Sequence, residues 1–436
     1  MAVFTNFIPI LLFVLIFFGS GVYYSIQGIE NAFYQVPPTS AILPSIIIAW
    51  LMNKSDTKGT MTNFLSGARH PDIITMCIIF LLAGALSSVT KSIGSVESTV
   101  NFTLSVTPEN LLLIGVFITS ALISTAIGTS MGTIAALASL VTELSLQGAF
   151  AVEIGAATLV GGAMFGDNMS VISDTTIAAV SSQHANLKEK LKLNIKIALV
   201  ASFITICVLL FADNSEIELI ERHYSFLLIT PYILLVFLAV LGINVFIVMT
   251  IALCFSGLVG IIFGTYTILA FARDISTGFR DMNEIMLLSI LIGGLSGLSN
   301  HNPKELAEKI ANLLPKNAGK RSAELVIAAL ASLFDILLAN NTIAIIFSGS
   351  IAKELAKKYG IKPHESAAWL DIFSCVLQGI IPYGAQILLV CAVAQVSPLD
   401  VIGKVYYCYI LALVTSAYIM FRKNSCQHKK STSSYS

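Results

Sequence analysis

Charged side chains are scarce in this sequence: Asp, Glu, Lys and Arg together make up 11% of its 436 residues. Tryptophan occurs twice, and the seven cysteines are scattered singly, without the close pairs of a zinc site or a disulfide framework. Positive and negative charges balance, so nothing indicates a nucleic-acid partner. Hydrophobic residues make up 56% of the chain, more than a water-soluble domain normally contains. The composition therefore predicts an all-α polytopic membrane protein with no soluble domain.

Long apolar spans follow one another along the chain, and most have the length of one membrane crossing. The first, residues 4–24, lacks a basic n-region and a small-residue cleavage site, so we interpret it as a retained helix. Several spans are too long for a single crossing or are interrupted by Pro382-Tyr383-Gly384, and these are 110–146, 150–182, 323–352 and 365–396. They predict helices that are broken or re-entrant at the membrane midplane.

Basic residues gather in segments that we expect to be loops, and the positive-inside rule places them on the cytoplasmic side. These segments are Lys54 to Arg69, Lys188 to Lys196, Lys304 to Arg321, Lys353 to Lys362 and Arg422 to Lys430. They share one side only if residues 110–146 and 323–352 are re-entrant hairpins, which enter and leave the membrane on the same side. The acidic segment from Asp213 to Glu221 and a loop at 267–284 then lie outside. We therefore expect a multi-pass protein of the cytoplasmic (inner) membrane with both termini in the cytoplasm.

The order of the spans repeats within the chain. The expected hairpin tip at Gly128-Thr129-Ser130 corresponds to Ala339-Asn340-Asn341, and Gly166 corresponds to Gly379. Each half then contains five transmembrane helices and one re-entrant hairpin, and because five is odd the halves must be inverted relative to each other. We expect residues 1–213 to form the first inverted repeat and residues 214–424 the second. Residues 425–436 are expected to be a disordered cytoplasmic tail.

A polar island interrupts the apolar span at residues 150–182. It runs from Gly166 to Thr176 and holds Asp167, Asp174, two serines and two threonines. Each aspartate at mid-bilayer opposes membrane insertion by roughly 3 kcal/mol. Ionisable residues at this depth mark functional sites, and a broken helix that carries them is typical of ion-coupled transporters. The island therefore predicts an ion or proton site.

Further polar clusters fall at the expected hairpin tips and helix breaks, where hydroxyl, amide and carbonyl oxygens suit Na⁺ and carboxylates supply charge. The predicted ion- or proton-binding residues are Asp167, Asp174, Asp335 and Asp371, the first and second of them binding Na⁺ directly. The predicted ion or substrate ligands are Asn168, Ser170, Ser173, Thr175, Thr176, Thr129, Ser130, Asn340, Asn341, Thr342 and Gln386. Hydroxyls in membrane helices can instead bond only the preceding turn. No lysine or arginine in the deep parts of these spans is expected to pair with Asp167 or Asp174.

The island resembles a family signature. Residues 166–176 read GDNMSVISDTT, which resembles GDKMSPLSDTT of the NhaC family of Na⁺/H⁺ antiporters. Residues 128–133 read GTSMGT, which resembles that family's GTSWGT. Asn168 stands in place of the usual lysine and Met131 in place of tryptophan, as expected of a divergent member. The resemblance implies the inverted-repeat fold of the ion transporter superfamily, with paired hairpins.

The combined expectation is a secondary transporter that exchanges Na⁺ for H⁺ by alternating access and is not an enzyme. A carboxylate in a wet, low-dielectric pocket can hold a proton or, when charged, Na⁺, so one site with mutually exclusive occupancy is sufficient for exchange. Asp174 and Asp167 would be the shared carriers. No cofactor is expected beyond the transported Na⁺, and the partners are Na⁺, H⁺ and the lipid bilayer. The sequence leaves the oligomeric state open, a homodimer included.

Two alternatives accompany this prediction. A Na⁺-coupled carboxylate or amino-acid transporter could share the fold, with the hairpin tips holding the substrate. The lack of a deep basic residue to neutralise a dicarboxylate favours the cation exchanger. An intramembrane aspartyl protease would need a pair of facing aspartates and a Gly-x-Gly-Asp motif. Met164 occupies the position of that motif's first glycine, so this second alternative is disfavoured.

Overall fold

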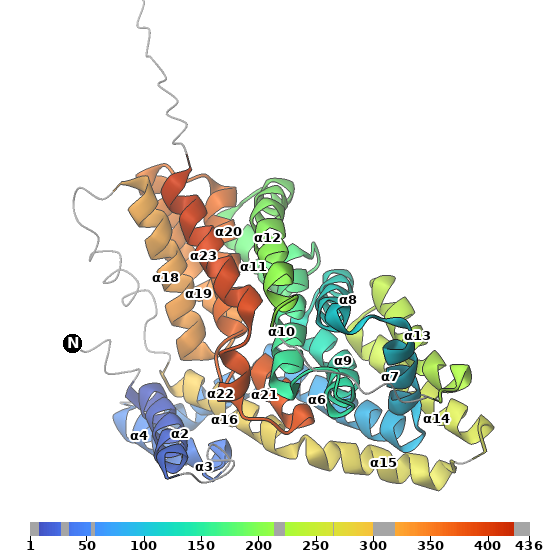
Figure 1. The fold of residues 1–436 in the computed structure, drawn as a ribbon. Helices are drawn as coiled ribbons and strands as arrows, with labels where there is room; N and C mark the ends of the chain where they lie inside the picture. The colour runs from blue at the N-terminus through green and yellow to red at the C-terminus, as the bar shows by residue number, and fades with distance from the viewer. Residues whose placement is uncertain are drawn as a thin grey trace, which may run out of the picture.

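The computed structural model describes residues 8–27, 35–53, 57–212, 223–264, 266–299 and 319–422. All regular structure within these ranges is helical, which confirms the all-α fold class. Figure 1 shows the helices packed into one elongated bundle with α10 (Val152–Met169) near its middle. The predicted join between the halves at 213–224 falls mostly outside the described residues, as do residues 304–318 of the third basic segment and the tail at 425–436.

The helices before the join begin with a short group at the N-terminal side and continue into the bundle. In chain order they are α2 (Ile8–Ile26), α3 (Pro38–Ala41), α4 (Leu43–Met52), α5 (Thr57–Ala68), α6 (Pro71–Ser92), α7 (Ser95–Val106), the 3₁₀ turn η2 (Glu109–Leu111), α8 (Leu112–Ile127), α9 (Ser130–Leu146), α10, α11 (Asp174–Gln183) and α12 (Leu187–Leu209).

The helices after the join end in two paired helices, a broken helix and a final helix, the same order as α8 and α9, α10–α11 and α12 before the join. They are α13 (Phe226–Val240), α14 (Val245–Ile262), α15 (Ile268–Asp281), α16 (Asn283–Ser299), α18 (Lys320–Leu338), α19 (Asn341–Tyr359), α20 (Pro363–Gln378), α21 (Ala385–Ala394), α22 (Pro398–Ile402) and α23 (Tyr406–Phe421).

Some of these helices are long enough to cross a membrane. Helices α6, α12 and α14 are each long and apolar enough to cross a bilayer, and α15 with α16 meets the same test as a pair bent by 42°. Several shorter apolar helices, α8, α9 and α21 among them, lie at the predicted breaks. The apolar helices agree with a multi-pass membrane protein.

The two predicted hairpin tips have the same backbone geometry. At the first, Gly128 is left-handed (φ 80°, ψ 26°) and Thr129 is extended (φ −152°, ψ 125°). At the second, Ala339 is left-handed (φ 48°, ψ 32°) and Asn340 is extended (φ −149°, ψ 111°). The extended residue caps the following helix in both cases, Thr129 on Gly132 N and Asn340 on Ile343 N. The helices therefore break at the two positions that the sequence indicated.

Small residues bring α10 against α8. A Cβ atom on Gly162 would collide with the Ser120 side chain, and one on Gly166 would collide with Ser124. Ser124 Oγ also donates a hydrogen bond to the Ala163 carbonyl at 2.6 Å. This close approach matches the small-residue interfaces of membrane helices. It fixes the C-terminal end of α10, which carries Asp167, beside the break between α8 and α9.

Two segments expected as loops are helices. Within residues 54–69, α5 packs on α16 through Gly67 and Gly297, whose backbones touch. Within residues 267–284, α15 packs on α6 through Gly278 and Gly84 in the same way. Low hydropathy suggested loops, but each segment keeps helical periodicity and a glycine that allows another helix to approach. The expectation of loops there was wrong.

Candidate functional site

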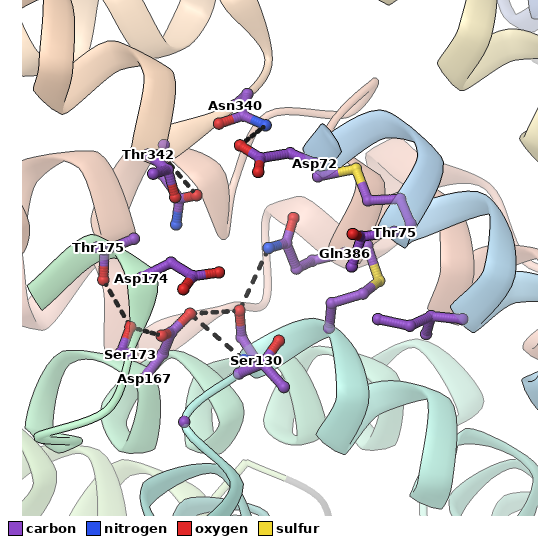
Figure 2. Close-up of a pocket in the computed structure, with 16 residues that line it drawn as sticks. Asp72, Thr75, Ser130, Asp167, Ser173, Asp174, Thr175, Asn340, Thr342 and Gln386 are labelled. Carbon is purple, nitrogen blue, oxygen red and sulfur yellow. Dashed lines mark hydrogen bonds between the residues drawn. The ribbon is translucent and has the colours of Figure 1, made fainter. Parts of the chain in front are cut away.

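The helix breaks converge on a single cavity of about 100 Å³ (Figure 2). It lies between the first turns of α6, α9, α11, α19 and α21 and the last turn of α10. Its lining residues are Asp72, Thr75, Met76, Ile79, Gly128, Thr129, Ser130, Met131, Asp167, Ser173, Asp174, Thr175, Asn340, Asn341, Thr342 and Gln386. Residues of both predicted tips, part of the polar island (Asp167 and Ser173 to Thr175) and Gln386 therefore meet, although they lie far apart in the sequence.

Asp167 is held by hydroxyl and amide donors at the wall of the cavity, and its side chain is buried. Ser130 Oγ donates to its Oδ2 at 2.7 Å and the Ser130 amide donates to the same oxygen at 3.3 Å. Ser173 Oγ donates to its Oδ1 at 2.5 Å. Three hydrogen bonds to the carboxylate stabilise its charge without supplying a positive charge. When Asp167 is ionised, no positive side chain neutralises its charge towards an incoming cation.

A chain of side-chain hydrogen bonds joins Asp167 to the second tip. Gln386 Nε2 donates to Ser130 Oγ at 3.2 Å, and Gln378 Nε2 donates to Gln386 Oε1 at 2.7 Å. Gln378 Nε2 also lies 3.4 Å from the Ala339 carbonyl. The break in α20–α21 positions both glutamines, so this chain connects the first tip to the second across the cavity.

Asp174 is the first residue of α11 and its carboxylate points into the cavity (Figure 2). Unlike Asp167 it is exposed, and it accepts no hydrogen bond from any residue of the described ranges. The neighbouring Ser173 and Thr175 hydroxyls lie 2.9 Å apart and line the same wall. Asp174 therefore has a free carboxylate at the mouth of a helix break.

The second tip faces Asp72, which was not among the predicted site residues. Asn340 Nδ2 donates to Asp72 Oδ2 at 3.3 Å while its Oδ1 caps α19. Asn341 Oδ1 accepts from the Thr342 amide at 3.0 Å. Asp72 lies in the first turn of α6, where the sequence reads as the edge of a basic loop. Only the contact with Asn340, 268 positions away, reveals its place in the site.

The charged side chains that line the cavity are all acidic. Asp72, Asp167 and Asp174 contribute carboxylates, and no lysine or arginine is among the lining residues. Nevertheless, the described residues contain no cluster of three or more His, Cys, Asp or Glu side chains that could hold a metal ion. A bound monovalent cation would therefore combine one carboxylate with neutral hydroxyl, amide and carbonyl oxygens, which are abundant around Thr129, Thr175 and Thr342.

Five predicted site residues lie outside the cavity lining: Asn168, Ser170, Thr176, Asp335 and Asp371. Ser170 Oγ accepts from the Ile172 amide at the end of α10. Asp335 is fully buried near the end of α18, and within the described ranges neither of its carboxylate oxygens has a hydrogen-bond partner. Its role as an ion or proton site stays a prediction.

Asp371 forms a buried ion pair. Lys190 Nζ lies 2.5 Å from Asp371 Oδ2, and both side chains are fully buried. Asn168 Nδ2 and Asn194 Nδ2 each donate to the same carboxylate oxygen at 3.1 Å. Lys190 also donates to Thr176 Oγ1 at 2.8 Å. Asn168, Thr176 and Asp371 therefore belong to one polar network behind the cavity wall.

Lys190 corrects the expectation that the basic segment from Lys188 to Lys196 is a loop without deep charges. The segment lies within α12, and Lys190 points into the protein. Among the described residues, no basic side chain is paired with Asp167 or Asp174. Helical spacing in the sequence indicates the inward direction of Lys190 in part, because it places Lys190 on one face with Asn194, Ile197 and Ala201. The structure shows that all four are buried.

This chain is similar to known transporters. The model of the Na⁺/H⁺ antiporter family matches residues 41–214, which contain α6, the first tip and the polar island. The Na⁺/H⁺ antiporter NhaC of Bacillus subtilis (strain 168) is 26% identical over 396 residues, covering 83% of this chain and 86% of that protein. The crystal structure of the Alcanivorax borkumensis YdaH transporter matches with a TM-score of 0.46 and 15% identity, covering 94% of this chain and 97% of that one.

Proposed function

We propose that this chain, a divergent relative of NhaC within the Na⁺/H⁺ antiporter family, exchanges Na⁺ for H⁺ across the membrane. The observation that carries the proposal is the cavity where both helix tips meet three carboxylates and no basic side chain. Such a site attracts small cations and repels carboxylate substrates. The protein is a transporter and not an enzyme, and Na⁺ and H⁺ are its cargo; no resident cofactor is part of the proposal.

The free carboxylate of Asp174 is suited to taking up a proton or Na⁺, and the hydrogen-bonded carboxylate of Asp167 is suited to supplying a second, fixed negative charge. Asp174 can take up a proton or contribute charge to Na⁺ without first breaking a protein contact. Asp167 supplies a second negative charge held in place by Ser130 and Ser173. A proton and Na⁺ compete for the same carboxylates, so occupancy is mutually exclusive. Alternating access to the two sides then yields exchange.

The test is a pH-gradient collapse assay in proteoliposomes. Adding Na⁺ outside vesicles with a preset pH gradient should dissipate the gradient, and Li⁺ and K⁺ in separate runs establish selectivity. Amino acids and dicarboxylic acids added with Na⁺ test the symporter. Collapse that needs an organic acid, with none by Na⁺ alone, would replace the exchange proposal by Na⁺-coupled organic-acid transport.

We also propose that the chain consists of two inverted repeats, 1–213 and 214–424, each with five transmembrane helices and one re-entrant hairpin. The support is the matching backbone of the breaks at Gly128-Thr129 and Ala339-Asn340. The paired helices α18 and α19, which run side by side in Figure 1, also support a hairpin. The proposed location is the cytoplasmic membrane, with both termini in the cytoplasm.

This topology predicts the outcome of cysteine labelling in whole cells, after the native cysteines have been replaced. Single cysteines introduced near Ser145 and near Val396, at the exposed positions Leu146 and Gln395, should react with a membrane-impermeant maleimide added outside. Those at Asn186 and Lys358 should react only after the membrane is permeabilised, because the positive-inside rule keeps basic segments in the cytoplasm. Outside labelling at Lys358 would rule out the second hairpin and with it the inverted repeat.

The second tip provides a test of ion coordination. Asn341→Ala removes an amide oxygen from the cavity lining and should raise the apparent KM for Na⁺ by about tenfold, the equivalent of ~1.4 kcal/mol. Asn244→Ala is the matched control, because Asn244 also lies at a helix start, capping α14, but does not line the cavity. The control should leave KM unchanged. If Asn341→Ala alters organic-acid preference while Na⁺ dependence stays unchanged, the tip binds substrate and the symporter is favoured.

A further inference from the structure

A second cavity, of about 480 Å³, lies at the end of the bundle where α12, α18 and α20 begin and α23 ends. Figure 1 shows these helix ends together at the top of the molecule. Five permanently cationic side chains line this cavity, against two glutamates. It is separate from the cavity at the helix breaks, with which it shares no lining residue.

The charges in this cavity are only partly paired. Glu365 accepts from Lys320 Nζ at 2.8 Å and from Arg422 Nη1 at 2.9 Å. Glu189 lies 2.8 Å from His364 Nδ1. The remaining cations, Lys192, Lys196 and Lys362, are exposed at the rim and form no ion pair with any residue in the described part of the chain.

The backbone adds to this positive potential. Helices α18 and α20 begin at Lys320 and Pro363, so their N-terminal amides and positive dipole ends lie at the cavity. Lysines at a helix N-terminus oppose the dipole and raise the local potential further. An anion in the cavity would offset the positive charge of the lysines and of the helix ends, because helix N-termini and lysines both bind phosphate groups.

The rim lysines continue into an apolar stripe on α12. Lys192, Lys196, Leu199 and Phe203 follow helical spacing along one face. Leu199 and Phe203 are 57% and 69% exposed, so this face is covered by no described part of the protein. A ligand with an anionic head and an apolar tail fits this arrangement, with its head at the lysines and its tail along the helix.

We propose that this cavity binds the phosphate head group of an anionic membrane lipid, whose acyl chain lies along the Leu199 and Phe203 face of α12. Basic pockets between membrane helices recognise such head groups. The positive-inside rule accounts for basic residues on one side of a membrane. It does not account for the convergence of residues from four helices on one cavity continuous with an exposed apolar face. The proposal does not depend on the exchange reaction.

The experiment compares two variants with the same change in charge. The cavity variant carries Lys192→Gln, Lys196→Gln and Lys362→Gln. The control variant carries Lys188→Gln, Lys353→Gln and Lys357→Gln, three exposed lysines on α12 and α19 that do not line the cavity. The melting temperature of each purified full-length protein is measured in detergent micelles containing phosphatidylglycerol, in micelles containing phosphatidylcholine, and in lipid-free micelles with inorganic phosphate.

Phosphatidylglycerol should raise the melting temperature of the unsubstituted protein and the control variant by a few degrees, because a ligand that binds the folded state stabilises it. The cavity variant should lose most of this shift, and the single change Lys362→Gln should lose part of it. Equal shifts in the cavity variant and the unsubstituted protein would overturn the proposal, as would equal losses in both variants or equal effects of the two lipids. An inorganic phosphate shift as large as that of phosphatidylglycerol would overturn the assignment to a lipid.

Discussion

Replacing Asp174 by asparagine should abolish both Na⁺-driven proton movement and Na⁺/Na⁺ exchange in proteoliposomes, while the protein still folds and inserts. Asparagine keeps the size of the side chain and one oxygen ligand, but it neither binds a proton in the physiological range nor offsets the charge of Na⁺. The melting temperature in detergent should stay level or rise, since Asp174 accepts no hydrogen bond within the described ranges and membrane aspartates oppose insertion.

The control for this substitution is Asp400→Asn. Asp400 is also an exposed aspartate in the first turn of a helix, α22, but it does not line the cavity. Exchange by this variant should be normal. A lower melting temperature with residual transport in Asp174→Asn would indicate a structural role at the helix break instead. A stable Asp174→Asn protein that still exchanges Na⁺ for H⁺ would end the carrier hypothesis.

Replacing Lys190 by methionine should lower the free energy of unfolding by about 3–5 kcal/mol, because it leaves the buried charge of Asp371 without a counter-charge. The two asparagine amides that bond Asp371 reduce this cost but carry no net charge. The double variant Lys190→Met with Asp371→Leu should recover most of the loss, since a buried ion pair and an apolar pair of similar volume are often close in stability. Unfolding in detergent measures both effects.

The same double variant tests the predicted role of Asp371 in ion binding. If Asp371 is part of the ion path, the recovered protein should be stable and inactive. Wild-type exchange by the double variant would remove Asp371 from the path and leave it a structural partner of Lys190. Failure of the second substitution to restore stability would show that the ion pair does not account for the cost of losing Lys190.

The sequence predicted the helix breaks well because their causes are local. Gly128 tolerates a left-handed backbone, Asn340 caps the helix that follows it, and the island around Asp167 places polar groups inside an apolar span. Such features act within a few residues, so they are visible without a structure. Residues of the first tip, the second tip and the island were therefore predicted as ligands, and some residues of each line the cavity.

Other contributors were missed because their roles depend on tertiary contacts. Asp72 looks like a loop residue until Asn340 is placed against it. Lys190 belongs to a run of lysines of which Lys188, Lys192 and Lys196 are exposed, and its inward direction follows from the turn of α12. Loop charge decides which side of a membrane a segment favours, but helical rotation decides which of its residues is buried.

The hydrogen-bonded chain from Gln378 to Asp167 has a direction. Gln378 donates to Gln386, Gln386 donates to Ser130, and Ser130 donates to Asp167, so every donor in the chain points towards the carboxylate. An ionised Asp167 accepts at the end of this chain through Oδ2. A proton on Oδ2 would reverse the direction of the last link, because the Ser130 hydroxyl would then turn and accept from Asp167. The change stays within the contact between Ser130 and Asp167, because Ser130 Oγ can accept from Asp167 and from Gln386 at once and the two helix tips remain joined through the glutamines.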